Sequence, residues 1–467
     1  MGGVLLATVP SPVRTFNPNL GLLYLAASLR SAGIEVRLLD LASLYGPRDI
    51  DTLKTAINEQ RPEVLGFNLL TENALYAYEI VESLRSFDDL CIIAGGPHPT
   101  AEPLEVLKHG FDVVVLGEGE ETLVELVQKL HAGGSLSSVN GLAWLDEDQR
   151  MQQSVPRALP DDLDLLSSPL DVVDLYERDR YVNLGNSLLP PIITSRGCPG
   201  TCTFCSNNVS GCSYRFHSTS RVIEEVKAWQ EHEGVVSLFF QDTAFTADRN
   251  RTIDLCCQLK ELSPRVFWVC KARCDQIDSE LAKLMSEAGC TSIFFGVESG
   301  SDEVLKRVGK GITVDKIEKA VKIAHSSGIG VYVHIMVGFP DETVEELQET
   351  ARLMERLAPM VKGFPTGGIL LPYPGTSIYK LQHEELGCTN WWLDRATVDC
   401  INTSKRGPGG KSPTSAEEVV TLHAAIEKAF LDAGVVTYSG EVTQAMIECL
   451  KVRRSLNQKI LEGQFLT

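Results

Sequence analysis

The chain has 467 residues, of which 43% are apolar and 22% are charged, a balance that is ordinary for a globular protein. Its formal net charge of −19 argues against a broad nucleic-acid contact, no apolar run is long enough to span a membrane, and the first residues lack the features of a signal peptide. We therefore expect a cytoplasmic protein of two large units, whose 13 cysteines are metal ligands or reduced core thiols and not a disulfide framework.

Residues 1–135 alternate short apolar runs with helical periodicity, which is the pattern of a parallel sheet with crossover helices. The five expected strands are Val4–Val9, Glu35–Leu39, Val64–Phe67, Cys91–Ala94 and Val113–Leu116. A doubly wound, Rossmann-like sheet of this kind binds ligands at the carboxyl ends of its strands. The loops that we expect to line a ligand site are 10–19, 40–46, 68–73, 95–100 and 117–121.

Five residues in these loops are candidates for ligand binding. Gly95 and Gly96 follow the fourth expected strand, Gly117 and Glu118 follow the fifth, and Thr71 follows the third. Glycine at a strand end lets a ligand approach the backbone closely, and the helix that comes next supplies N–H donors. Many α/β domains carry such loops, so these residues alone do not identify a ligand.

Residues 136–190 are rich in Asp, Pro and Ser and predict a connector with room for one small hairpin. A second alternating series occupies 191–395, with expected strands near Ile192–Ser195, Ser237–Phe240, Val266–Cys270, Ser292–Val297, Val331–Val337 and Ile369–Leu371. Six β/α repeats predict a partial six-stranded barrel, because closure needs eight. Residues 396–467 predict a small helical C-terminal region, with helices at 415–434 and 441–462.

Three cysteines, Cys198, Cys202 and Cys205, lie on one loop at the end of the first expected barrel strand. Thiolates at this spacing can bind three irons of a cubane 4Fe–4S cluster and leave the fourth iron open for a substrate. The alternatives are a zinc loop or three core thiols. A structural zinc site needs four ligands, and no second pair of cysteines stands at a conventional spacing nearby.

This triplet, with Phe204 just before the last cysteine, resembles the signature of the radical S-adenosylmethionine superfamily. The resemblance extends through the later expected strand ends, including Phe339-Pro340. It implies that the segment with Gln241 and Asp242 offers backbone acceptors to the methionyl amino group. It also implies that three further residues approach the rest of the nucleoside, and these are Arg273, Glu298 and Ser299. For Glu298, a surface carboxylate is the alternative. We expect no second cluster from the other cysteines.

The glycine-containing loops of residues 1–135, placed ahead of such a barrel, resemble the cobalamin-binding domain of the cobalamin-dependent radical S-adenosylmethionine enzymes. One departure is that the cobalt-ligating motif Asp-x-His-x-x-Gly is absent, since Asp40 is followed by Leu-Ala-Ser-Leu-Tyr. The resemblance implies that cobalamin binds without a ligand from that motif. The alternative is a remnant fold that holds no cofactor. His98, between two prolines, is interpreted as a packing residue and not a cobalt ligand.

The two resemblances together imply a C-methyltransferase that acts on an unactivated carbon of a small molecule or natural product. In that reaction a 5′-deoxyadenosyl radical abstracts hydrogen and cobalamin supplies the methyl group. An external electron donor such as flavodoxin or ferredoxin is implied as a partner. A cyclase, oxidase or rearrangement enzyme with the same cofactors is the first alternative. A methylthiotransferase-like RNA-modifying enzyme is the second, and it predicts a basic C-terminal β-barrel module.

Overall fold

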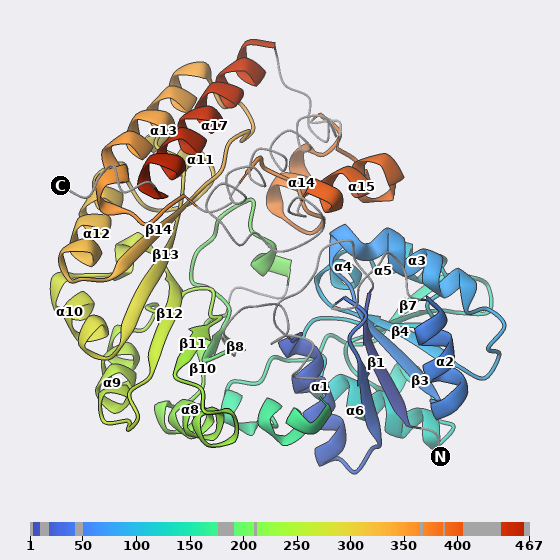
Figure 1. The fold of residues 1–467 in the computed structure, drawn as a ribbon. Coiled ribbons are helices and arrows are strands. Elements are labelled where there is room, and N and C mark those ends of the chain that lie inside the picture. Colours follow the sequence, from blue (N-terminus) through green and yellow to red (C-terminus); the bar gives the residue numbers. More distant parts are fainter. Residues whose placement is uncertain are drawn as a thin grey trace.

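The protein is described by a computed structural model that covers residues 3–9, 18–42, 50–175, 191–209, 213–364, 368–385, 388–404 and 440–461. It has the predicted α/β class, with one mainly parallel sheet in the N-terminal part of the chain and a second parallel sheet after it (Figure 1). The helix predicted at 415–434 and most of the loop predicted at 10–19 lie outside the described residues.

The N-terminal sheet has seven strands in the order β2-β1-β3-β4-β5-β6-β7. Its strands are β1 Val4–Thr8, β2 Val36–Leu39, β3 Val64–Asn68, β4 Cys91–Gly95, β5 Val113–Val115, β6 Leu142–Leu145 and β7 Met151–Gln153. The first five are parallel and confirm the predicted strands. The hairpin expected in the connector is formed by β6 and β7, which pair antiparallel and extend this sheet at its β5 edge.

Helices cover both faces of this sheet (Figure 1). They are α1 Leu20–Ser31, α2 Ile50–Gln60, α3 Ala74–Ser83, α4 Pro97–Ala101, α5 Pro103–Lys108 and α6 Glu120–His131, with short 3₁₀ turns at Thr71–Asn73, Leu136–Ser138, Leu163–Leu165 and Pro169–Leu175. Local signals fix where they begin and end. The side chain of Asn19 accepts a hydrogen bond from Leu22 N at the start of α1, and Gly33, with φ of +74°, follows its end.

The second sheet has five parallel strands in the order β14-β13-β12-β11-β8. They are β8 Pro191–Ile192, β11 Ser237–Phe240, β12 Phe267–Ala272, β13 Cys290–Glu298 and β14 Gly330–Ile335, and a separate antiparallel pair is β9 Ser195–Arg196 with β10 Arg215–Phe216. Helices pack on one face of the sheet, on its outer side in Figure 1. They are α8 Thr219–Glu233, α9 Arg249–Lys260, α10 Ser279–Glu287, α11 Asp302–Arg307, α12 Val314–Ser326 and α13 Val344–Leu357, with 3₁₀ turns at Ser206–Val209, Cys274–Gln276 and Ala358–Met360.

The sixth strand predicted for this barrel, Ile369–Leu371, is not a ladder strand. Val337 and Ile369 form one isolated parallel bridge, beside the end of β14. The prolines at 372 and 374 have no N–H to donate, so the pairing cannot continue past Leu371. The partial barrel therefore has five strands and one bridged segment.

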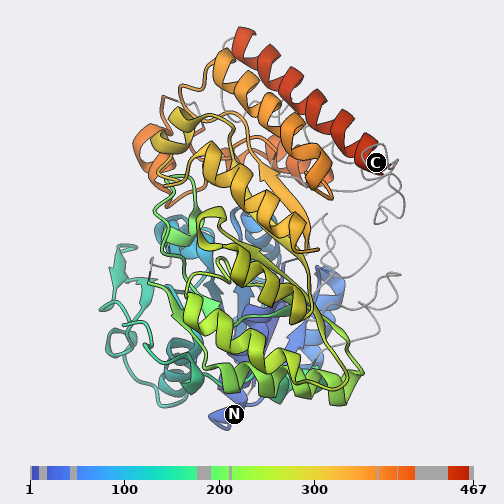
Figure 2. The ribbon, with the colours of Figure 1, turned by 90° about the vertical axis from the view of Figure 1, so that its left-hand side faces the viewer.

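The C-terminal part of the chain joins both units. The segment with α14 Ser377–Gln382, the turn Trp391–Leu393 and α15 Arg395–Ser404 packs on α3 and α5 of the first unit (Figure 1). There Trp392 Nε1 donates to Glu105 Oε1 at 2.8 Å. The last described helix, α17 Gly440–Leu461, confirms the helix predicted at 441–462 and lies along α13 (Figure 2). Among the described residues, no helix combines the length and apolarity needed to cross a bilayer.

A candidate cofactor site at the carboxyl ends of the two sheets

The three cysteines lie on the loop that leaves β9, and neighbouring backbone holds this loop in place. Thr203 N donates to Val308 O at 2.9 Å and Cys205 N donates to Cys202 O at 3.1 Å. At the start of the loop, Gly197 has φ of +81°, and a Cβ atom there would stand 2.1 Å from the carbonyl oxygen of Ser213. Only glycine fits this position, so the turn that presents the cysteines depends on it.

The cysteine thiols lie close to one another and to two cations. Burial raises the pKa of the Cys202 thiol, and the positive charges of Lys310 and Arg273 oppose that rise. Burial also raises the pKa of Cys205, and the charges of Cys202 and Cys198 add to it. No group of three His, Cys, Asp or Glu residues in the described ranges is arranged to hold a single metal ion. A cubane cluster has a different requirement, because each thiolate binds its own iron at a separate corner.

Two of the residues implied for the nucleoside lie near the cysteine loop. Arg273 follows β12, pairs with Asp275 at 3.0 Å and donates to the Lys310 carbonyl at 2.8 Å, and its guanidinium would be 2.8 Å from a Cβ placed on Gly200. Glu298 ends β13 with φ of +72° and pairs with Lys310 Nζ at 2.8 Å. Glu298 is 8% exposed, so it is not the surface carboxylate that was the alternative.

The third, Ser299, is fully buried within the protein. Its hydroxyl lies 3.1 Å from Thr350 Oγ1 and accepts a hydrogen bond from Ser301 N. A direct role of this side chain at a ligand would require it to leave those bonds. Its role stays a prediction.

The Gln241–Asp242 pair follows β11, and its two side chains have different surroundings. Gln241 lines the cavity described below, and its backbone N–H donates to Ile192 O at 2.8 Å. The Asp242 carboxylate is buried and accepts bonds from Thr194 N at 2.6 Å and Ser195 N at 2.9 Å. The Asp242 side chain therefore fastens the start of the cysteine loop to β11. Because the Asp242 side chain is occupied, the contact with a methionyl amino group that the resemblance implies would have to come from backbone carbonyls of this segment, and it stays a prediction.

A cavity of about 420 Å³ opens where the carboxyl edge of the first sheet faces the cysteine loop. Its lining is mainly apolar, with Leu6 and Phe67 among the residues, and Gly66, Gly95 and Gly96 lie along its wall. A Cβ on Gly66 would meet Leu6 Cδ2 at 2.8 Å, and one on Gly96 would meet Leu69 O at 2.8 Å, so side chains there would disturb the wall. The opposite wall comes from the second unit, namely Ile193, Ser195, Arg196, Gly197, Gln241 and Thr243.

Four of the five predicted residues of the first unit line this cavity: Gly95, Gly96, Gly117 and Glu118. The fifth, Thr71, is buried at the start of the 3₁₀ turn after β3 and is not among the lining residues. Gly117 has φ of +73°, as a glycine at a strand end should. The structure thus brings four candidates of the first unit and one of the second, Gln241, to the same cavity.

Glu118 has a partner that the sequence did not suggest. Arg196 Nη1 lies 3.0 Å from Glu118 Oε2, Arg196 Nη2 lies 2.6 Å from Glu120 Oε1, and Arg215 also pairs with Glu118. Burial alone raises the pKa of Glu118, but the hydrogen bond from Arg215 and the charge of Arg196 outweigh it and hold this pKa below its usual value. Glu118 therefore joins the two units and is not a free acceptor for a cofactor.

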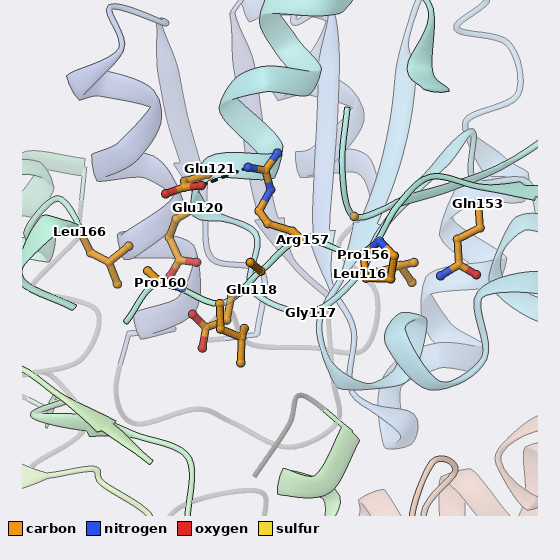
Figure 3. Close-up of a pocket in the computed structure, with 13 residues that line it drawn as sticks. Leu116, Gly117, Glu118, Glu120, Glu121, Gln153, Pro156, Arg157, Pro160 and Leu166 are labelled. Carbon is orange, nitrogen blue, oxygen red and sulfur yellow. Dashed lines mark hydrogen bonds and ion pairs between the residues drawn. The ribbon is translucent and has the colours of Figure 1, made fainter. Parts of the chain in front are cut away.

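A second, smaller cavity of about 300 Å³ lies on the other side of the same loop (Figure 3). Figure 3 shows Glu120, Glu121 and Arg157 around it, with Arg157 Nη1 paired to Glu121 Oε2 at 3.0 Å. Arg157 pairs with Glu125 as well. Because these charged side chains already have protein partners, the loop 117–121 is held from both sides.

Sequence reasoning missed Lys310, Arg196 and Arg215. Two signals were available: Arg196 stands two residues before the first cysteine, and Lys310 is flanked by two glycines, Gly309 and Gly311. Arg215 had no comparable signal, because its place beside Glu118 follows from the pairing of β10 with β9.

Asp40, where the cobalt-ligating motif breaks off, and His98, which was considered as a cobalt ligand, both bind protein atoms. Asp40 accepts a hydrogen bond from Thr8 Oγ1 at 2.7 Å and from Ala42 N at 3.1 Å. His98 is fully buried, with its Nε2 3.0 Å from Tyr78 OH and its ring against Trp392. His98 is a packing residue, as interpreted from the sequence.

Each of the two units matches the model of a known protein family. Residues 192–354 match the model of the radical SAM superfamily, and residues 7–127 match the model of the B12 binding domain. The first region contains the three cysteines, and the second contains the glycine loops of the cavity.

Relatives align over most of the chain. An uncharacterized methyltransferase of Pyrococcus horikoshii is 32% identical over 83% of this chain and 84% of its own length. The hopanoid C-3 methylase of Methylococcus capsulatus is 27% identical over 80% of this chain and 70% of its own. The anaerobic magnesium-protoporphyrin IX monomethyl ester cyclase of Rubrivivax gelatinosus is 25% identical over 78% of this chain, which spans 65% of the cyclase.

Two solved structures share the fold. The radical methyltransferase TsrM of Kitasatospora setae, with cobalamin and a [4Fe-4S] cluster bound, has a TM-score of 0.68 and 20% identity over 83% of this chain and 76% of its own. The cobalamin-dependent enzyme OxsB, with aqua-cobalamin and S-adenosylmethionine bound, has a TM-score of 0.66 and 22% identity over 77% of this chain, which spans 52% of OxsB.

Proposed function

Because the chain belongs to the cobalamin-dependent radical S-adenosylmethionine enzymes, we propose that it is a C-methyltransferase that acts on an unactivated carbon of a small molecule. The cofactors of this family are a 4Fe–4S cluster, S-adenosylmethionine and cobalamin. When bound, the cluster supplies the electron that cleaves S-adenosylmethionine, and cobalamin supplies the methyl group. A reductant and a small-molecule substrate are required as well.

The observation that carries this proposal is the cavity shared by the two units. Its one wall is the glycine-lined edge of the first sheet, and its other wall includes Arg196 and Gly197, which lead directly into the cysteine loop. A cofactor held at the sheet edge would therefore face a cluster held by Cys198, Cys202 and Cys205. The donor set fits a cubane cluster, because three soft thiolates leave one iron open.

The protein's own contribution is orientation and shielding. The ion pairs of Glu118 and Glu120 with Arg196 fix the two walls relative to each other, and the mainly apolar lining of the cavity disfavours water beside a bound cofactor. Arg273 and Lys310 place two positive charges near Cys202, where an anionic cluster would lie. Asp242 anchors the loop that carries the cysteines.

Two finer points also belong to the proposal. We expect flavodoxin or ferredoxin as the electron donor, in the cytoplasm.

The experiment that tests methyl transfer does not need the natural substrate. Full-length protein reconstituted anaerobically with iron, sulfide and hydroxocobalamin would be incubated with S-adenosylmethionine and titanium(III) citrate. We expect S-adenosylhomocysteine to form only when cobalamin is loaded, alongside 5′-deoxyadenosine from cleavage at the cluster. Formation of 5′-deoxyadenosine without any S-adenosylhomocysteine would exclude methylation and favour the cyclase-type alternative.

The RNA-modifying alternative has less support. It requires a basic β-barrel module at the C-terminus, whereas residues 440–461, the part of the tail that the structure describes, form one helix with both acidic and basic residues. The net charge of −19 also opposes binding to a polyanion.

A further inference from the structure

The second sheet has one face that no helix of the described residues covers. Along β12, for example, Trp268 and Cys270 are buried among the helices, whereas Val269 and Lys271 are only half-buried. The same alternation holds in β11, β13 and β14. Because successive side chains of a strand point to opposite faces, the half-buried residues share the face opposite the helices. Those with large side chains are Phe239, Lys271, Phe294, Tyr332 and His334.

The strand register places three of these residues in one row. Lys271 is opposite Phe294, and Phe294 is opposite Tyr332, across three neighbouring parallel strands. The rings of Phe294 and Tyr332 are stacked, with centroids 4.7 Å apart and planes 12° apart. His334 stacks on Phe294 at 5.9 Å, and Phe239 lies 6.1 Å from Phe294 on the other side. The face therefore carries a continuous aromatic floor with one lysine in it.

Lys271 is a cation without an ion-pair partner in the part of the chain that the structure describes. Its Nζ lies over the ring of Phe239, 5.4 Å from the centroid. Burial lowers its pKa, and only the charge of Asp242 opposes this. The Asp242 carboxylate already accepts bonds from Thr194 and Ser195. A half-buried ammonium in such surroundings favours a ligand that brings one negative charge.

The row lies directly below the proposed cofactor site. Lys271 is two residues before Arg273, which contacts the cysteine loop, and Phe239 is two residues before Gln241, which lines the cavity. Two residues along a strand span about 7 Å. A small molecule on the row would thus lie within reach of chemistry at the carboxyl ends of the strands.

We infer that this row of Lys271, Phe294 and Tyr332, together with Phe239 beside it, binds the substrate, and that the substrate is a small molecule with an aromatic body and one carboxylate. The inference rests on the proposed function, because it names the substrate class of that same site. The aromatic body packs on the ring edges of Phe294 and Tyr332, and the carboxylate accepts a hydrogen bond from Lys271 Nζ. A single lysine is a point charge that matches one anionic group, while a polyphosphate would need several cations.

The test measures binding, without turnover. Reconstituted full-length protein would be titrated with 2-naphthoate and with the neutral analogue 2-naphthalenemethanol by anaerobic isothermal calorimetry. We expect wild-type protein to prefer 2-naphthoate. Lys271→Gln should weaken 2-naphthoate by about tenfold, the usual size of a lost charge-assisted hydrogen bond, and leave the alcohol unchanged. Lys271→Arg should retain most of the preference, and Phe294→Leu should weaken both probes.

The matched controls are Lys283→Gln, an exposed lysine on α10, and Phe267→Leu, an exposed phenylalanine at the start of β12, and both should bind like wild type. The inference is overturned if wild-type protein does not bind 2-naphthoate, or if Lys271→Gln binds it as tightly as wild type. Formation of S-adenosylhomocysteine, measured on the same samples without any probe, reports on methyl transfer alone. A failure of the substrate class and a failure of the proposed function therefore give different results.

Discussion

The two sheets of this protein are built from the same β/α alternation, but they bury their strands differently. In the first sheet every residue of β1 and β5 is buried, because helices cover both faces. In the second, the buried residues of β12 and β14 alternate with half-buried or exposed ones, because the described helices cover one face only. An open α/β sheet offers a ligand only its carboxyl edge, whereas a partial barrel offers its edge and its inner face.

This difference separates the tasks of the two units. The edge of the first sheet carries glycines along the cavity, and the space beside Gly95 and Gly117 is free of close protein atoms, as the proposed cofactor site requires. The second sheet carries the cysteine loop at its edge and, on its inner face, side chains that can bind a substrate. The two edges meet through the buried pairs of Glu118 with Arg196 and Arg215. The difference also predicts which substitutions damage each unit.

The largest effect is expected for Cys202→Ala. Without this ligand the cluster should be lost, so the iron content and the broad visible absorption of the reconstituted protein should fall to the background. Cobalamin uptake should persist, because the cavity wall of the first sheet is unchanged. Cys256→Ala is the matched control, since Cys256 is a fully buried core residue of α9, and it should bind iron normally. Equal iron loss in both variants would contradict the ligand assignment.

The next largest effect is a difference in stability between substitutions on the two faces of β13, where Phe294 and Phe295 are neighbours in sequence. Phe295 is fully buried against the helices, and Phe295→Ala should lower the free energy of unfolding by about 3–5 kcal/mol. Phe294 is half-buried on the inner face, so Phe294→Ala should lower it by less than about 2 kcal/mol. Urea unfolding of the apo-protein, followed by circular dichroism, measures both. A larger loss for Phe294→Ala would mean that the inner face is core.

A third substitution tests the junction between the units. Arg215 is 7% exposed and pairs with the half-buried Glu118, so Arg215→Met should leave this carboxylate with Arg196 as its cationic partner and cost about 2 kcal/mol. The control is Arg30→Met, which breaks the exposed pair of Arg30 with Asp174 and should cost less than about 1 kcal/mol. Thermal unfolding of both variants is the measurement. Similar losses for the two would show that the junction adds no more than a surface pair.

The smallest effect is a pH dependence at the same junction. The pKa of Glu118 is below its usual 4.5 in the folded protein, so its ionised form stabilises the fold above that value. This stability is lost as the pH falls through the lower folded pKa. The difference in melting temperature between wild type and Glu118→Gln should therefore be constant between about pH 6 and 8 and vanish in acid. If this difference in melting temperature grew on acidification, the pKa of Glu118 would be raised in the folded protein, which would contradict its pairing with the arginines.

The sequence predicted the five parallel strands of the first sheet to within one or two residues, because each is a short apolar run bounded by turns, whereas β6 and β7 were expected only as a hairpin in the connector. It also singled out the cysteines, whose chemistry depends on spacing along a single loop. It gave no sign that Glu118 would pair with Arg215, since residues 97 positions apart meet only through the docking of two units. It predicted Ile369–Leu371 as a full strand because the apolar run outweighed the prolines that follow it.

The aromatic row could not be predicted either. In the sequence, Phe294 and Tyr332 are as compatible with a strand buried under helices as with the inner face of a barrel. Only the strand register shows that they stack beside Lys271. Ser299 and Asp242 show the opposite case: the resemblance implies a place near a ligand for both, which stays a prediction, while the structure shows that their side chains bind protein atoms.

In the proposed arrangement, a cluster on Cys198, Cys202 and Cys205 and a cobalamin at the edge of the first sheet face each other across one cavity. The most direct test is anaerobic reconstitution with iron, sulfide and hydroxocobalamin, followed by metal analysis and an absorption spectrum of the purified protein. This arrangement of the cofactors predicts about four iron atoms and about one cobalt atom for each chain. The Cys202→Ala protein should lose the iron and keep the cobalt. Protein that holds zinc in place of iron, or that releases all its cobalamin on gel filtration, would contradict this arrangement.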